Sequence, residues 1–177
     1  MKIKKILPVT IALVVILAIG VYSWVGRDGL VRGLVISTDA KGYNVSLKMI
    51  DDADFASEVT INDRLNLTPC TFDNGTFIDQ NGNTVTDDEN YVKMYHLIAK
   101  TDNAGALSMA FDYNGGIPAR CYVQIGNEWT ELTSTLEGLK TITGQISFTL
   151  AFIVDAESYD VAHANMSSTA NVTVHCE

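Results

Sequence analysis

Three cysteines, Cys70, Cys121 and Cys176, are the side chains of this 177-residue chain best suited to covalent chemistry. A catalytic thiol needs a histidine beside it in an electropositive setting. His175 adjoins Cys176, but successive residues of a strand face opposite sides of a sheet, so the two side chains diverge. We therefore expect no catalytic cysteine. Three cysteines allow one disulfide in three ways, and the pattern leaves open whether one disulfide forms or the thiols only pack.

The remaining chemistry-bearing residues lack the spacings that mark a metal or catalytic site. His96, His163 and His175 are far apart in the sequence, whereas zinc ligands come in tight pairs. The chain has no P-loop, dinucleotide fingerprint or Gly-x-Ser-x-Gly motif. Residues 79–89 are similar to a calcium loop in composition but lack EF-hand spacing, which leaves loose calcium binding as an alternative. We expect a non-enzymatic protein with no catalytic residue, no cofactor and no metal site.

Five Asn-x-Ser/Thr triplets are candidate N-glycosylation sites in an exported chain. A strand with Asn, Ser and Thr on its outer face and apolar residues on its inner face contains the same triplet. The triplets can therefore reflect strand alternation instead of glycosylation. The two asparagines in predicted loops, Asn74 and Asn165, are better candidates than the others. The complete set is Asn44, Asn66, Asn74, Asn165 and Asn171.

The N-terminal segment predicts export. Lys2, Lys4 and Lys5 precede residues 6–25, which form an uncharged and mostly apolar run of twenty residues. Such a run is a signal peptide or a membrane-spanning helix, and the lysines keep its start in the cytoplasm. Small residues predict cleavage between Ser23 and Trp24, with a second possibility after Gly20. Residues 1–25 are thus a signal peptide or anchor, and residues 26–177 an exported domain at the cell surface or outside the cell.

The charge of the exported part argues against nucleic acid as a partner. Without the three lysines of the leader, the remaining side chains comprise 9 basic and 21 acidic residues, so the formal charge changes from −9 to −12. A surface of that sign repels phosphate backbones.

Alternation of apolar and polar residues predicts an all-β domain, because a period of two is typical of half-buried strands. The Asp73-Asn74-Gly75 segment predicts a two-residue hairpin turn. Many short strands favour a two-sheet sandwich of jelly-roll or immunoglobulin-like topology. The predicted strands include residues 34–37, 43–50, 58–67, 91–100, 106–113, 120–125, 128–132, 145–155 and 171–176.

The junction Gly20-Val21-Tyr22-Ser23-Trp24-Val25 resembles the signal-peptide ending of the camelysin and TasA-like bacterial proteins, which a SipW-type signal peptidase processes. The likeness is specific over these six residues; beyond them it is one of strand pattern. Val25 departs from the second aromatic common in the family, and three cysteines are unusual for it. The resemblance implies a jelly-roll domain and a subunit of an extracellular fibre or surface layer.

The first strand after the leader is a candidate for assembly. A strand at a chain end can pair with the sheet of a neighbouring copy instead of its own, although pairing within the same copy is the simpler alternative. Self-association, or association with other surface proteins, is the expected partnership. The candidate donor strand spans residues 30–36 and includes Leu30, Val31, Leu34, Val35 and Ile36.

A different class of function is the alternative: a membrane-tethered extracellular module that binds a ligand or carbohydrate. Tyr122 and Trp129 lie near the predicted Gly126-Asn127 turn. If exposed, the two rings would form a platform on which a sugar stacks.

Overall fold

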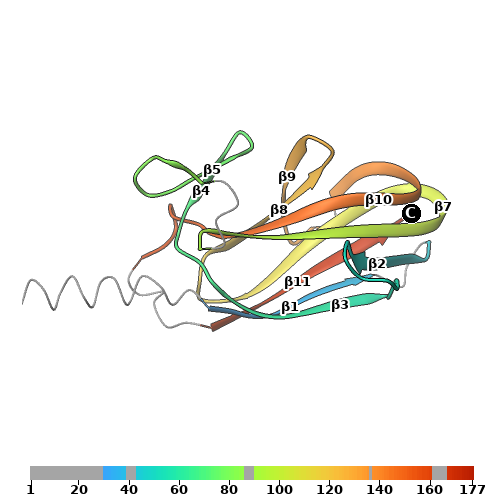
Figure 1. Ribbon diagram of the computed structural model, residues 1–177, viewed down its shortest axis with the longest axis horizontal. Helices are drawn as coiled ribbons and strands as arrows, with labels where there is room; N and C mark the ends of the chain where they lie inside the picture. Colours follow the sequence, from blue (N-terminus) through green and yellow to red (C-terminus); the bar gives the residue numbers. More distant parts are fainter. Residues whose placement is uncertain (1–29, 39–42, 86–89, 136, 161–166) are drawn as a thin grey trace, which may run out of the picture.

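The computed structural model describes residues 30–38, 43–85, 90–135, 137–160 and 167–177, and this part of the chain is all-β (Figure 1). This confirms the predicted class. The leader, its cleavage position at Ser23 and Trp24, His163 and Asn165 lie outside the described residues. Within the described ranges, no helix has the length and apolar character needed to cross a bilayer.

Eight strands form one sheet in the order β3-β1-β11-β7-β10-β8-β9, with β2 paired to β7. Three short strands form a second sheet in the order β4-β5-β6. The main-sheet strands are β1 (Leu30–Thr38), β2 (Val45–Met49), β3 (Glu58–Asn66), β7 (Val92–Gly115), β8 (Ala119–Ile125), β9 (Glu128–Leu132), β10 (Glu137–Val154) and β11 (Ser167–Cys176). The small-sheet strands are β4 (Thr71–Asp73), β5 (Thr76–Ile78) and β6 (Thr84–Val85).

The main sheet folds over into two layers because its two longest strands bend. Phe152 of β10 pairs with Lys93 of β7, yet its ring centroid lies 5.9 Å from that of Phe111, near the other end of β7. A straight strand would separate Lys93 and Phe111 by about 60 Å. β7 and β10 therefore turn back together, as Figure 1 shows at its right-hand side, with β8 and β9 in one layer and β1, β3 and β11 in the other.

The bend explains one difference from the sequence prediction. Residues 91–100 and 106–113 are predicted as separate strands, but the structure joins them in the 24-residue β7. Thr101 pairs with Gly144 and Gly105 with Ile142, so the strand pairing resumes after the exposed Asp102 and Asn103, which lie within the register shift at the bend. The pairing register shifts between Ile142 and Gly144, and Gly144 has a φ of 80°. A bulge of this kind bends a strand without ending it.

The alternating residues of the predicted strands meet between the two layers. Leu107 and Met109 of β7, Leu150 of β10 and Val172 of β11 are each fully buried in one apolar cluster. Each large aliphatic side chain removed from water in this way stabilises the fold by roughly 1.5–3 kcal/mol. Two packed β layers are thus present, both within one hydrogen-bonded sheet, whereas the jelly-roll or immunoglobulin-like topology of the predicted two-sheet sandwich stays a prediction.

The small sheet covers the outer face of the layer that contains β8 and β10. Its hairpin turns through Asn74 and Gly75, with φ values of 47° and 86°, as the sequence predicts. Phe77 of β5 packs with Tyr122 of β8 and Ile153 of β10 in a second apolar cluster, separate from the main core. The small sheet is therefore held by side chains that point away from the main core.

Candidate functional site

The predicted donor strand, β1, lies inside the sheet. It pairs in parallel with β11, from Leu30 opposite Ser167 to Thr38 opposite Val174, and antiparallel with β3 on its other side. Leu34 is 1% and Ile36 0% exposed, since both point into the main core. β1 thus supplies main-chain hydrogen bonds to two strands and apolar side chains to the core.

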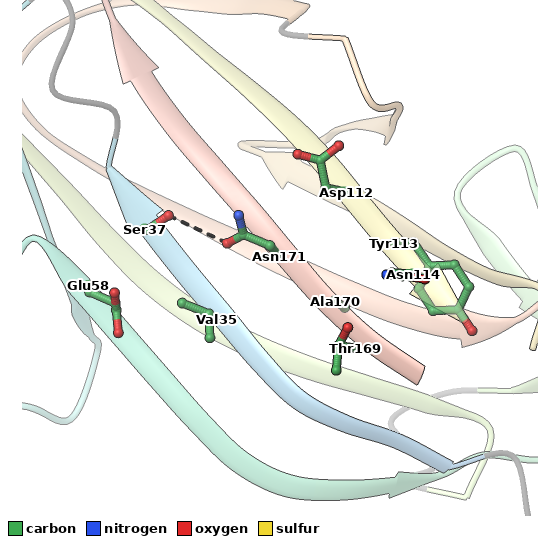
Figure 2. A pocket seen from close by; sticks show the side chains of 9 residues that line it. All are labelled: Val35, Ser37, Glu58, Asp112, Tyr113, Asn114, Thr169, Ala170 and Asn171. Atoms are coloured by element: carbon green, nitrogen blue, oxygen red, sulfur yellow. Dashed lines mark hydrogen bonds between the residues drawn. The ribbon is translucent and has the colours of Figure 1, made fainter. Parts of the chain in front are cut away.

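The outer face of these strands carries an open groove of about 740 Å³ (Figure 2). The Ser37 hydroxyl donates a hydrogen bond of 3.5 Å to Oδ1 of Asn171 across the β1–β11 pair. Figure 2 shows Glu58 of β3 and Asp112 of β7 on opposite sides of that pair. The lining residues are Val35, Ser37, Glu58, Asp112, Tyr113, Asn114, Thr169, Ala170 and Asn171.

The three cysteines are free and buried. Cys121 and Cys176 belong to the main core, whereas Cys70 lies in the cluster beneath the small sheet. Burial, and secondarily the Asp155 carboxylate, raises the pKa of the Cys70 thiol to about 12. Burial also raises the pKa of Cys121 well above its ordinary value. Both thiols are therefore protonated and poorly nucleophilic at neutral pH. One disulfide and plain packing of the thiols both stay as the alternatives that the sequence leaves.

The described histidines have separate structural settings. His175 is 6% exposed, and its Nε2 lies 3.4 Å from Oε2 of Glu177. Exposed His96 is hydrogen-bonded through Nδ1 to Oγ1 of Thr149, at 2.9 Å. Among the residues that the structure describes, no group of three or more His, Cys, Asp and Glu side chains is arranged to hold a metal ion.

The suspected calcium loop begins with a turn that Asp79 closes. The amides of Asn81 and Asn83 each donate to Oδ1 of Asp79 at 2.8 Å, and Nδ2 of Asn83 donates to its Oδ2 at 3.0 Å. The side-chain hydrogen bond from Asn83 is the largest influence that lowers the pKa of Asp79. The carboxylate oxygens are thus engaged by the loop itself, and residues 86–89 lie outside the described ranges.

The glycosylation candidates occupy different surroundings. Asn74 and Asn44 are exposed, Asn74 at the tip of the β4–β5 hairpin. Asn171 is half-buried in the groove of Figure 2, and Asn66 ends β3. Glycosylation at these positions stays a prediction.

The predicted aromatic platform is wrong for one of its two rings. Tyr122 is 4% exposed because Phe72 covers it, with ring centroids 4.3 Å apart. Trp129 remains half-buried and lines a hollow of about 440 Å³ between the small sheet and the main sheet. His96, Gln124 and Thr149 line the same hollow, and sequence reasoning missed them because no local signal places β7, β8 and β10 side by side.

Comparisons with known proteins give little further guidance. No protein-family model matches the chain, and no curated protein matches it. Among solved structures, the P pilus rod subunit PapA is similar at 14% identity and a TM-score of 0.33, over 50% of this chain and 80% of its own. A glycoside hydrolase family 44 endoglucanase from Clostridium acetobutylium ATCC 824 shares 10% identity at a TM-score of 0.16, over 59% of this chain and 20% of its own. Likenesses at such TM-scores carry no argument about function.

Proposed function

We propose that this chain is a non-enzymatic, exported structural protein of the cell surface, whose copies assemble into a fibre or matrix by exchanging β1. In this arrangement the β1 of one copy lies between β3 and β11 of the next. The leader delivers the domain across the membrane and either is removed before Trp24 or remains as an anchor.

The position of β1 is the observation that carries the proposal. It is the first described strand after the apolar segment, and yet it is an interior strand, with β3 on one side and β11 on the other. Removal of β1 would leave two strand edges unpaired and uncover the core beside Leu34 and Ile36. An open slot with these properties accepts an identical strand from a neighbour.

Exchange changes few contacts. The same side chains fill the same slot whichever copy supplies them. The free-energy difference between the closed and exchanged forms therefore comes mainly from the conformation of the segment that joins β1 to β2 and from the protein concentration. In a head-to-tail exchange each copy donates β1 to the next. Such an assembly closes into a ring only if the rotation that relates successive copies adds up to a full turn, and otherwise it grows as an open polymer.

A competing peptide tests the proposal. The protein from its own cells is dissociated in denaturant and diluted in the presence of excess peptide LVRGLVIST, the sequence of β1. We expect sedimentation and electron microscopy to show polymers without the peptide and progressively shorter ones with it, because the peptide caps the open slot.

A scrambled peptide of the same composition is the control and should leave the length distribution unchanged. Assembly that is indifferent to the β1 peptide, or a protein that stays monomeric at every concentration, would contradict the proposal.

A further inference from the structure

One row of side chains crosses four strands on the outer face of the layer that contains β8 and β10. His96 of β7 pairs with Thr149 of β10, Thr149 pairs with Gln124 of β8, and Gln124 pairs with Trp129 of β9. Paired residues of antiparallel strands project from the same face. The register therefore aligns an imidazole, a hydroxyl, an amide and an indole.

Two adjoining hollows follow this row. The first, of about 440 Å³, has the small sheet as its other wall, where Thr76 and Thr84 add hydroxyl groups. The second, of about 270 Å³, continues past His96, Gln124 and Thr149, which belong to both hollows. Because the two hollows share these three residues, they adjoin, and we treat them as one groove with room for more than one unit of a chain-like ligand.

Among the residues that the structure describes, the lining of the two hollows contains no Asp, Glu, Lys or Arg, although the chain has 21 acidic and 12 basic side chains. A charged ligand would find no counter-ion among these residues, and burying an unpaired charge is costly. A neutral ligand meets no such penalty.

The indole is held in place by its neighbours. Phe77 meets Trp129 edge-on, with centroids 5.6 Å apart and planes at 89°, and Phe72 lies 5.8 Å away at 62°. A side chain already fixed by packing loses little conformational entropy when it binds a ligand.

We propose that this groove binds a neutral oligosaccharide, with one sugar ring against Trp129 and with hydroxyl groups hydrogen-bonded to Gln124 and to the Thr149–His96 pair. Sugar rings present an apolar face beside polar edges, which matches an indole followed by uncharged donors and acceptors. The inference does not rest on exchange of β1, since the row lies on β7, β8, β9 and β10.

The full chain, purified in a zwitterionic detergent that contains no sugar, is titrated with hexasaccharides of glucose, mannose, galactose and N-acetylglucosamine. We expect at least one to bind with a calorimetric signal and to alter the indole fluorescence, which the Trp129→Phe variant loses. Gln124→Glu keeps the shape but adds a charge, and Thr149→Val removes only the hydroxyl. Each should weaken binding about tenfold, the effect of one unsatisfied or repelled polar group in a site.

Gln145→Glu is the matched control, because Gln145 is exposed on β10 outside both hollows, and it should bind like the unchanged chain. Melting temperatures check that each variant is folded, and Gln124→Glu remains informative if Thr149→Val is destabilised. The inference is overturned if no hexasaccharide binds, if both groove variants bind as tightly as Gln145→Glu, or if only acidic saccharides or a neutral hexapeptide bind.

Discussion

At the scale of single residues, an ion pair with a buried carboxylate joins β8 to the end of β10, beside the point where the small-sheet segment pairs with the main sheet. Asp155, 3% exposed, accepts hydrogen bonds from Nη2 of Arg120 at 2.8 Å and from the Ser158 hydroxyl at 2.7 Å. The neighbouring backbone pairs with Cys70, whose amide donates to the carbonyl of Val154. These bonds fix the start of the small-sheet segment against the end of β10.

Removing the buried carboxylate should destabilise the fold. Asp155→Ala leaves the Ser158 hydroxyl without this acceptor and removes the closer of two carboxylates that contact Arg120, whose own side chain is 36% exposed and can regain water. We expect a loss of about 2 kcal/mol in the free energy of unfolding by urea. Glu131→Gln is the control, because the Glu131–Arg120 contact of 3.5 Å is largely exposed and should change stability by less than about 0.5 kcal/mol. Equal effects of the two substitutions would contradict this account of the ion pair.

The Cys70 thiol predicts a pH dependence of stability. Burial, with the Asp155 carboxylate as the second cause, raises its pKa from 9.0 to about 12. Below pH 9 the folded and unfolded chains both keep the proton, so stability is fully present. Between pH 9 and about pH 12 the unfolded chain releases the Cys70 proton more readily than the folded chain does, so the free energy of unfolding falls as the pH rises.

Urea unfolding at about pH 8 and about pH 10 measures this fall. Cys70→Ala should show a smaller decrease than the unchanged chain, because one proton-linked group has been removed. An identical decrease in both proteins would show that Cys70 does not contribute.

At the scale of elements, local chemistry was predictable and long-range pairing was not. The Asn74-Gly75 turn follows from residues that tolerate positive φ, and the buried faces of β10 and β11 follow from alternation. The parallel pairing of β1 with β11 joins residues more than 130 positions apart. The bend of β7 likewise depends on packing between layers, which no window of sequence contains.

Gly105 is required where β7 bends. A Cβ atom there would lie 2.7 Å from Sγ of Cys176 and 2.9 Å from the carbonyl oxygen of Glu177. We expect Gly105→Ala to lower the free energy of unfolding by about 1–3 kcal/mol through overpacking. Gly138→Ala on β10 is the control, since the nearest atom to its Cβ is 3.9 Å away, and it should be neutral or slightly stabilising. Thermal unfolding of both variants measures the two effects. A Gly105→Ala variant as stable as the unchanged chain would contradict the close contact of position 105 with Cys176 and Glu177.

At the scale of the whole molecule, the two proposed functions occupy different layers. The exchange slot lies between β3 and β11, whereas the oligosaccharide groove crosses β7, β10, β8 and β9. Export and the donor strand are predictions drawn from the order of segments along the chain, and they stay predictions. Of the groove, only Trp129 was predictable, because its partners are set by the register of three other strands. The two proposals therefore use different strands, and either can hold without the other.

The most direct test of the central claim is a disulfide trap between β1 and β11. Ser37 and Thr173 are Cα partners across that pair, so Ser37→Cys with Thr173→Cys forms a bond within one chain if β1 pairs at home and between chains if it is exchanged. Ser46→Cys with Lys100→Cys, across the β2–β7 pair, is the control that stays within one chain in either case. Non-reducing electrophoresis of protein from the cell surface should show a ladder of linked multimers for the first variant alone. A single monomer band for both variants would contradict assembly through β1.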